Sequence, residues 1–99
     1  MRIRESLLAR RDIDQLYRYG IENFGEPIAD AYVARLLNVF EFIARHPALA
    51  RERSDISPPV RMHPHESHLV VYRSSPDEVE IVRVLPARAD WVNRLKPDA

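Results

Sequence analysis

The 99-residue chain contains no cysteine, which excludes a disulfide framework and a metal site built on thiolates. It also contains no apolar run of the ~18 residues that a membrane-spanning helix needs. The first residues, Met1 to Glu5, are mostly charged and lack the apolar core of a signal peptide. We therefore expect a single cytoplasmic domain over residues 1–99, with no contact to a membrane.

An excess of charge of one sign is missing as well. Lysine and arginine together number 15, as do aspartate and glutamate, and Lys96 is the only lysine. Domains that bind nucleic acid usually carry a basic excess, so direct DNA binding is not expected. Arginine makes the planar, bidentate contacts typical of protein interfaces, and a small neutral domain has little charge to keep it soluble alone. Both features favour a protein that works in a complex.

Two helices are predicted from apolar residues spaced three and four positions apart. The first begins at Leu7 and ends at Gly25, a residue type that commonly follows the last helical turn. The second begins at Glu26-Pro27 and ends by His46, because Pro47 disfavours helical backbone in the residue before it. The link between them is only about three residues long, so the helices must fold back as an antiparallel hairpin.

Strands account for most of the remaining chain. Segments rich in β-formers and bounded by turn residues predict strands at 1–5, 60–63, 67–73 and 78–85. Residues 48–59 are expected to form a loop, and residues 87–95 a short C-terminal helix. The order β-α-α-β-β-β predicts an α+β fold, with the helical hairpin packed on one face of a small, mostly antiparallel sheet of about four strands.

The strand at 78–85 is apolar on both faces, which raises the question of what covers it. Strict alternation divides its side chains into two sets, Val79, Ile81, Arg83 and Leu85 on one face and Val82 and Val84 on the other. A strand of this kind is buried on both faces, yet a single helical hairpin covers only one. We therefore expect the second face of the sheet to be open to something outside the chain.

Five short patterns follow one another along the chain. They are Ala9…Asp12-Ile13…Leu16…Tyr19, Phe24-Gly25…Ala29…Tyr32…Leu36, Ile43…His46-Pro47…Ala50-Arg51, Ile56…Arg61…His68 to Arg73, and Ile81…Arg83-Val84-Leu85. In order and spacing they resemble the RelE/ParE superfamily of bacterial type II toxins, and the ParE branch most closely. Two positions depart from the family pattern: Ala50 stands where a glycine is usual, and Pro86 where a histidine often follows the last strand.

The resemblance implies a toxin that inhibits DNA gyrase without catalysis, blocks replication and cell division, and needs no cofactor. It also implies neutralisation by a ParD-like antitoxin, in a heterotetramer or a larger complex. The alternative is ribosome-dependent mRNA cleavage, as in the RelE branch. That reaction needs a base, a proton donor and cations for the developing charge, and no tyrosine or histidine follows Tyr72. A non-toxic interaction module of the same fold is a third interpretation.

Candidate contacts with an antitoxin or a target are Arg61, His68, Tyr72, Arg73, Arg83, Arg88 and Trp91. Tyrosine, tryptophan and arginine are enriched where proteins bind each other. Arg83 is either such a contact or a structural arginine paired with Glu80 or Asp90, because an arginine in a central strand is costly to bury alone. Trp91 either contacts a partner or docks the C-terminal helix on the sheet.

The histidines and the acidic residues of the first helix have simpler interpretations. His63, His65 and His68 invite a metal site, but Pro64 interrupts them and no cysteine or suitably spaced carboxylate completes a ligand set, so no metal is expected. Asp12 and Asp14 are two positions apart on a helix and cannot face each other. Both are expected on the solvated face of that helix.

Overall fold

The computed structural model describes residues 1–88 and Leu95. Its elements are β1 (Arg2–Glu5), α1 (Leu7–Phe24), α2 (Glu26–Arg45), β2 (Glu52–Arg53), β3 (Val60–His65), β4 (His68–Ser74) and β5 (Glu78–Pro86). The strands form a 5-stranded sheet in the order β1-β5-β4-β3-β2, with β1 parallel to β5 and the other neighbours antiparallel. The predicted α+β fold is confirmed.

The strands differ from the prediction in two details. β2 lies inside the expected loop and adds a fifth strand, and its two residues are too few to show any periodicity. Pro64 lies within β3 and not in a turn. β2 covers only Val60 and Arg61, so Pro64 lies on an open edge, where a missing N–H breaks no ladder hydrogen bond. Most of the predicted helix at 87–95 lies outside the described residues.

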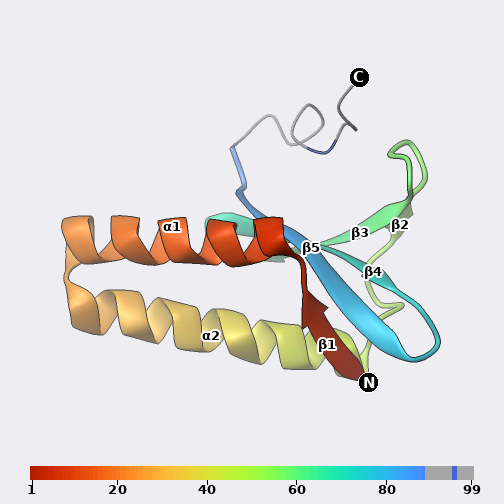
Figure 1. Ribbon diagram of the computed structural model, residues 1–99, viewed down its shortest axis with the longest axis horizontal. Coiled ribbons are helices and arrows are strands. Elements are labelled where there is room, and N and C mark those ends of the chain that lie inside the picture. The colour runs from red at the N-terminus through yellow and green to blue at the C-terminus, as the bar shows by residue number, and fades with distance from the viewer. Residues whose placement is uncertain (89–94, 96–99) are drawn as a thin grey trace.

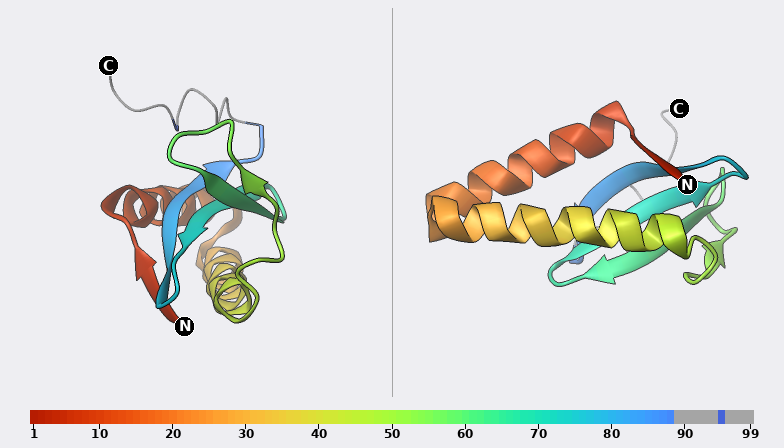
Figure 2. Two further views of the ribbon diagram at one scale, coloured as in Figure 1. Left: turned by 90° about the vertical axis from the view of Figure 1, so that its right-hand side faces the viewer. Right: turned by 90° about the horizontal axis from the view of Figure 1, so that it is seen from below.

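α1 and α2 form the predicted antiparallel hairpin, and Gly25 alone links them, with a φ of 89° that favours glycine. Ser6 starts α1 and ties it to β5: its Oγ accepts the Ala9 N–H at 3.0 Å and donates to the Val82 carbonyl at 2.7 Å. The hairpin runs past the end of the sheet, so its tip projects (Figure 1, Figure 2). Within residues 1–88, no helix is both long and apolar enough to cross a membrane.

The main core lies between the hairpin and one face of the sheet. Its buried members are Ala9, Leu36, Phe40, Ile43, Val70, Tyr72, Val79, Ile81 and Val84. Gly20 brings the two helices close together, because a Cβ at that position would lie 3.1 Å from the Cβ of Ala29. The hairpin is therefore held at its tip by helix–helix contact and at its base by the sheet.

A β-bulge in β5 changes which side chains reach this core. Tyr72 of β4 pairs with Ile81 and Val71 pairs with Arg83, so Val82 is an extra residue of β5 with no partner in β4. Beyond the bulge the side chains exchange faces, so that Val84 joins the main core and Leu85 packs on the opposite side. The two sets that strict alternation predicted therefore hold as far as Val82 and are wrong for Val84 and Leu85.

The second face of the sheet is covered by the chain itself, so the prediction of an open face is wrong. The segment after β2 brings Ile56 over that face, where it packs with Val60 of β3 and with Val71 and Leu85, which are completely buried. Met62, Val82 and Leu95 pack against the same cluster. Among the described residues, none of the large, exposed apolar side chains comes from this face.

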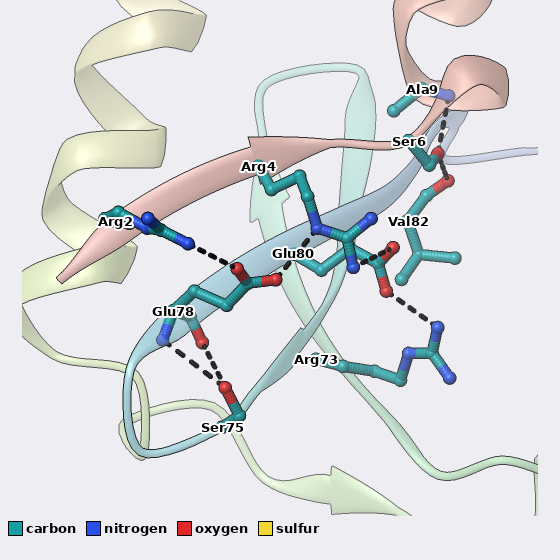
Figure 3. A network of polar contacts seen from close by, with 9 residues as sticks. All are labelled: Arg2, Arg4, Ser6, Ala9, Arg73, Ser75, Glu78, Glu80 and Val82. Carbon is teal, nitrogen blue, oxygen red and sulfur yellow. Dashed lines mark hydrogen bonds and ion pairs between the residues drawn. The ribbon is translucent and has the colours of Figure 1, made fainter.

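The rest of the second face carries ion pairs across three strands (Figure 3). Glu78 and Glu80 of β5 lie between arginines of the two neighbouring strands. Arg4 of β1 reaches Glu78 at 2.8 Å and Glu80 at 3.0 Å, and Arg73 of β4 reaches Glu80 at 2.7 Å. The hydrogen bond from Arg4 lowers the pKa of Glu78. Both acidic side chains on this face therefore have arginine partners within the chain.

Candidate partner-binding groove

A groove opens where the hairpin tip extends beyond the sheet. It has a volume of about 770 Å³ and is bounded by both helices, the turn between β3 and β4, and the end of β5. Its chief apolar side chains are Leu16, Tyr19, Phe24, Ile28 and Val84. A concave, mostly apolar site of this size with a few polar groups at its edges is typical of a binding site.

Three of the apolar side chains that line the groove are largely exposed: Tyr19 (61%), Phe24 (59%) and Ile28 (57%). The rings of Tyr19 and Phe24 meet edge to face, with centroids 6.3 Å apart. The backbone that carries them is held in place, because Gly20 and Ala29 fix the spacing of the helices. Large apolar side chains gathered on a projecting element are typical of surfaces that bind partners.

One wall of the groove is supported by an ion pair between α1 and β5. Arg83 donates to Asp12 through Nε at 2.8 Å and through a terminal nitrogen at 3.0 Å, and the Val84 N–H donates to the same carboxylate at 2.9 Å. The two side chains are only 15% and 9% exposed. The bonds to Asp12 raise the pKa of Arg83.

This ion pair gives Arg83 a structural role and corrects the placement of Asp12. Arg83 pairs with Asp12, whereas Glu80 pairs with Arg4 and Arg73. A contact of Arg83 with a partner stays a prediction. Asp90 lies outside the described residues. Asp12 faces the sheet, so the expectation that it lies on the solvated helix face is wrong. Asp14 does lie on that face, beside Arg18.

The opposite wall is formed by Tyr32 of α2 and His68 of β4. The Tyr32 hydroxyl lies 2.6 Å from His68 Nδ1, and the Tyr32 ring contacts the His65 ring with centroids 5.5 Å apart. Burial raises the pKa of Tyr32. Burial, and next the positive charge of a protonated His65, lower the pKa of His68. Arg35 lies over the Tyr32 ring and pairs with Glu66 at 3.1 Å, which closes the rim on this side.

Of the predicted contact residues that the structure describes, two line the groove, His68 and Arg88. Arg83 lies behind its wall. Arg73 is on the second face of the sheet, paired with Glu80. Trp91 lies outside the described residues.

Arg61 and Tyr72 hold the loop after α2. The Tyr72 hydroxyl donates to the Pro47 carbonyl at 2.9 Å, and Arg61 donates to the Ala50 carbonyl. Tyr72 is buried in the main core, where burial raises its pKa. Its side chain is therefore not available to a partner in this conformation.

Sequence reasoning missed the three exposed apolar residues at the groove: Tyr19, Phe24 and Ile28. Phe24 lies on the apolar stripe of α1, and the spacing of apolar residues predicts which side chains share a helix face. It does not predict where the sheet beneath that face ends. No signal in the sequence separates the part of the stripe that is covered from the part that projects.

Among residues 1–88 and Leu95, no group of three histidine, cysteine or acidic side chains is arranged to hold a metal ion. His63 instead contacts the Phe42 ring, and His65 and His68 contact Tyr32. The acidic and imidazole groups nearest the groove are engaged within the chain, Asp12 with Arg83 and Val84, and His68 with Tyr32. What the groove offers is therefore mainly apolar contact, with polar groups at its rim.

Comparison with known proteins places the chain in one family. Residues 3–91 match the model of the ParE toxin of the type II toxin–antitoxin system parDE. The chain is 33% identical over 84 residues to Toxin ParE3 of Caulobacter vibrioides, which covers 85% of this chain and 84% of that protein. It is also 33% identical over 82 residues to Toxin ParE1 of the same organism, covering 83% and 84% of the two chains.

A solved structure described as a chromosomal ParDE toxin–antitoxin system from P. aeruginosa has the same fold. Its TM-score is 0.77 at 19% identity, over 89% of this chain and 97% of that one. The helical hairpin, the mostly antiparallel sheet and the matched residues agree with one another. The chain belongs to the ParE toxin family of type II toxin–antitoxin systems.

Proposed function

We propose that the chain is a toxin that inhibits DNA gyrase by binding it, without catalysis, and that an antitoxin neutralises it by occupying the groove. The observation that carries the proposal is the groove itself, with Tyr19, Phe24 and Ile28 exposed on a rigid, projecting hairpin tip. Exposing these apolar side chains to water costs free energy, and a bound antitoxin would bury them.

Binding accounts better than cleavage for the groups that are present. In-line attack on RNA needs a base and a proton donor near the scissile phosphate. Asp12 is held by Arg83 and Val84, and His68 by Tyr32, so each already has a structural role. Pro86 ends β5, at the position where the family often has a histidine. The proposed activity is therefore that of an inhibitor in the cytoplasm and not of a nuclease.

The antitoxin segment that fits the groove is an amphipathic helix or an extended apolar stretch. Its apolar side chains would contact Tyr19, Phe24 and Ile28, and its polar side would reach Glu66 and Arg88 at the rim. This assignment replaces the open sheet face as the docking surface, because Ile56 and its neighbours cover that face. The complex is a hetero-oligomer, and DNA binding belongs to the antitoxin.

The proposed target is tested with gyrase and with ribosomes side by side. Purified chain at micromolar concentration is added to a DNA supercoiling assay and, separately, to ribosomes stalled on a defined mRNA. Inhibition of supercoiling with intact mRNA supports the proposal. Cleaved mRNA with full gyrase activity assigns the chain to the RelE type of activity, and no effect in either assay assigns it to a non-toxic module.

The role of the groove is tested by charge substitution at the hairpin tip. Phe24→Glu and Ile28→Glu place a carboxylate in the apolar lining, and Leu37→Glu places one on an exposed apolar position of α2 outside the groove. The probe is the antitoxin encoded beside the gene, titrated by calorimetry. We expect the two groove variants to bind about 100-fold more weakly, the loss typical of an interface hot spot, and Leu37→Glu to bind as wild type. If all three variants bind the antitoxin with the same affinity, the antitoxin binds a surface other than the groove.

A further inference from the structure

Three histidines lie on the helix-facing side of β3 and β4, where a core usually has aliphatic side chains. His65 pairs directly with His68 across the two strands, and His63 pairs with Val70, a member of the main core. Each imidazole contacts an aromatic ring of α2: His63 meets Phe42 at 5.9 Å, while His65 and His68 each lie 5.5 Å from the Tyr32 ring.

These contacts join α2 to the β3–β4 hairpin, beside the Arg35–Glu66 ion pair and the apolar packing of the main core. The strongest is the 2.6 Å contact between the Tyr32 hydroxyl and His68 Nδ1. Neutral His68 with its proton on Nε2 accepts this hydrogen bond. The His65 Nε2 is buried, and although it lies 3.2 Å from Glu66, it has no partner at hydrogen-bond geometry among the described residues. The contact with Tyr32 therefore suits a neutral His68.

We propose that His63 and His68 form an acid-sensitive latch that fastens α2 to the β3–β4 hairpin when both are neutral and loosens when they are protonated. Protonation puts a positive charge on each of these imidazoles, which lie against aromatic rings of α2. The charged form loses hydration on burial, and adjacent charges on His65 and His68 repel each other. Because Tyr32 and His68 also line the groove, loosening the latch changes the shape and charge of the groove wall.

The surrounding charges moderate this effect without reversing it. The groups that face the latch from the packed elements are Asp12 of α1, which is bound to Arg83 of β5, Arg35 of α2, Glu66 of the turn and Arg88 after β5. Asp12 and Glu66 favour a charged His68, but burial and His65 outweigh them, and the pKa of His68 is lowered. Burial, followed by His65, lowers the pKa of His63 in the same way.

The sign of the pH dependence follows from these directions. A histidine whose pKa is lower in the folded chain is protonated first in the unfolded chain. The stability that the latch contributes is therefore complete above about pH 6.5, the ordinary histidine value, and falls as the pH drops toward the lowered values. Each such histidine raises the unfolding constant by up to about tenfold per pH unit in that window. Carboxylates titrate near pH 4 and contribute little there.

The test is urea unfolding of the full chain between pH 7.5 and pH 5.5, for wild type and two single variants. His68→Asn keeps an acceptor for the Tyr32 hydroxyl but does not titrate. His46→Asn is the matched control, because His46 is exposed and contacts the Phe42 ring from outside the latch. We expect the unfolding constant of wild type and His46→Asn to rise as the pH falls, and that of His68→Asn to rise several-fold less. The same rise in all three chains overturns the proposal.

Two measurements on the wild type keep the test decisive if His68→Asn does not fold. NMR titration of the imidazole C–H signals should place the pKa values of His63 and His68 below about 6.5, and values above it refute the latch. Amide hydrogen exchange at pH 5.5 should show protection lost first around Tyr32 and His68 while β1 and β5 stay protected. Uniform loss of protection refutes a local latch. None of these results depends on gyrase or on an antitoxin, so they stand or fall apart from the proposed function.

Discussion

Replacing Asp12 by alanine should destabilise the chain far more than its position on a helix surface suggests. The carboxylate accepts two hydrogen bonds from Arg83 and one from the Val84 N–H, and it is only 9% exposed. Alanine removes all three acceptors and leaves the Val84 amide, inside a buried stretch of β5, without its partner. The change disconnects α1 from β5 at one wall of the groove.

The magnitude follows from how deeply the ion pair is buried. Breaking a buried, hydrogen-bonded pair by removing one member costs about 3–5 kcal/mol. Arg83 remains 15% exposed, so some solvent reaches it and the lower end applies, about 3 kcal/mol. For a domain of this size, each kcal/mol lowers the melting temperature by roughly 4–8 °C, which gives a loss of roughly 12–24 °C.

The assay is thermal and urea unfolding of three variants followed by circular dichroism. Asp14→Ala is the control, because Asp14 lies two residues away on the same helix and pairs with Arg18 on the surface, a contact worth about 0.5 kcal/mol or less. Asp12→Asn should fall between the two, since it keeps the shape and one acceptor but loses the charge. If Asp12→Ala unfolds within about 0.5 kcal/mol of Asp14→Ala, the ion pair has no structural role and the reasoning fails.

Three further predictions concern other contacts. Tyr72→Phe removes the hydrogen bond to the Pro47 carbonyl and should cost about 1 kcal/mol in urea unfolding, and an unchanged midpoint would deny that bond any net value. Gly20→Val crowds Ala29 at the helix crossing and should cost about 2 kcal/mol through overpacking; a more stable variant would contradict the close approach. Arg4 lowers the pKa of Glu78, so the stability from this pair is present above about pH 4.5 and is lost as the pH falls through the lowered value. Glu78→Gln should flatten that acid loss, and an unaltered pH profile would show that the pair does not contribute.

Much of the fold was predictable from local chemistry. The helical stripes, Gly25 between them and Pro47 after them define the hairpin, because each acts within a few residues of its own position. The hairpin and the later strands then leave few ways to form one sheet. The family resemblance rests on the same residues and led to the same fold.

The candidate site was less predictable, because its parts lie far apart in the sequence. The helical period places Asp12 on one side of α1, but only the packed fold brings Arg83, 71 residues later, to meet it. Ile56 lies in a segment without periodicity, so nothing local indicated that it covers the second face. Phe24 lies on the apolar stripe of its helix, and it and Ile28 are exposed because the sheet ends short of them.

The bulge at Val82 sets a limit on how the last strand can change in evolution. One apolar side chain in β5 can be exchanged for another of similar size at modest cost, since the layer that receives it stays the same. Loss of the bulge with every residue kept is different: each residue beyond Ile81 would shift by one position against β4, which would turn Leu85 toward the helices and Val84 away from them. A relative without the bulge should therefore also have one residue fewer between the positions of Ile81 and Leu85, so that the last two apolar side chains keep their faces.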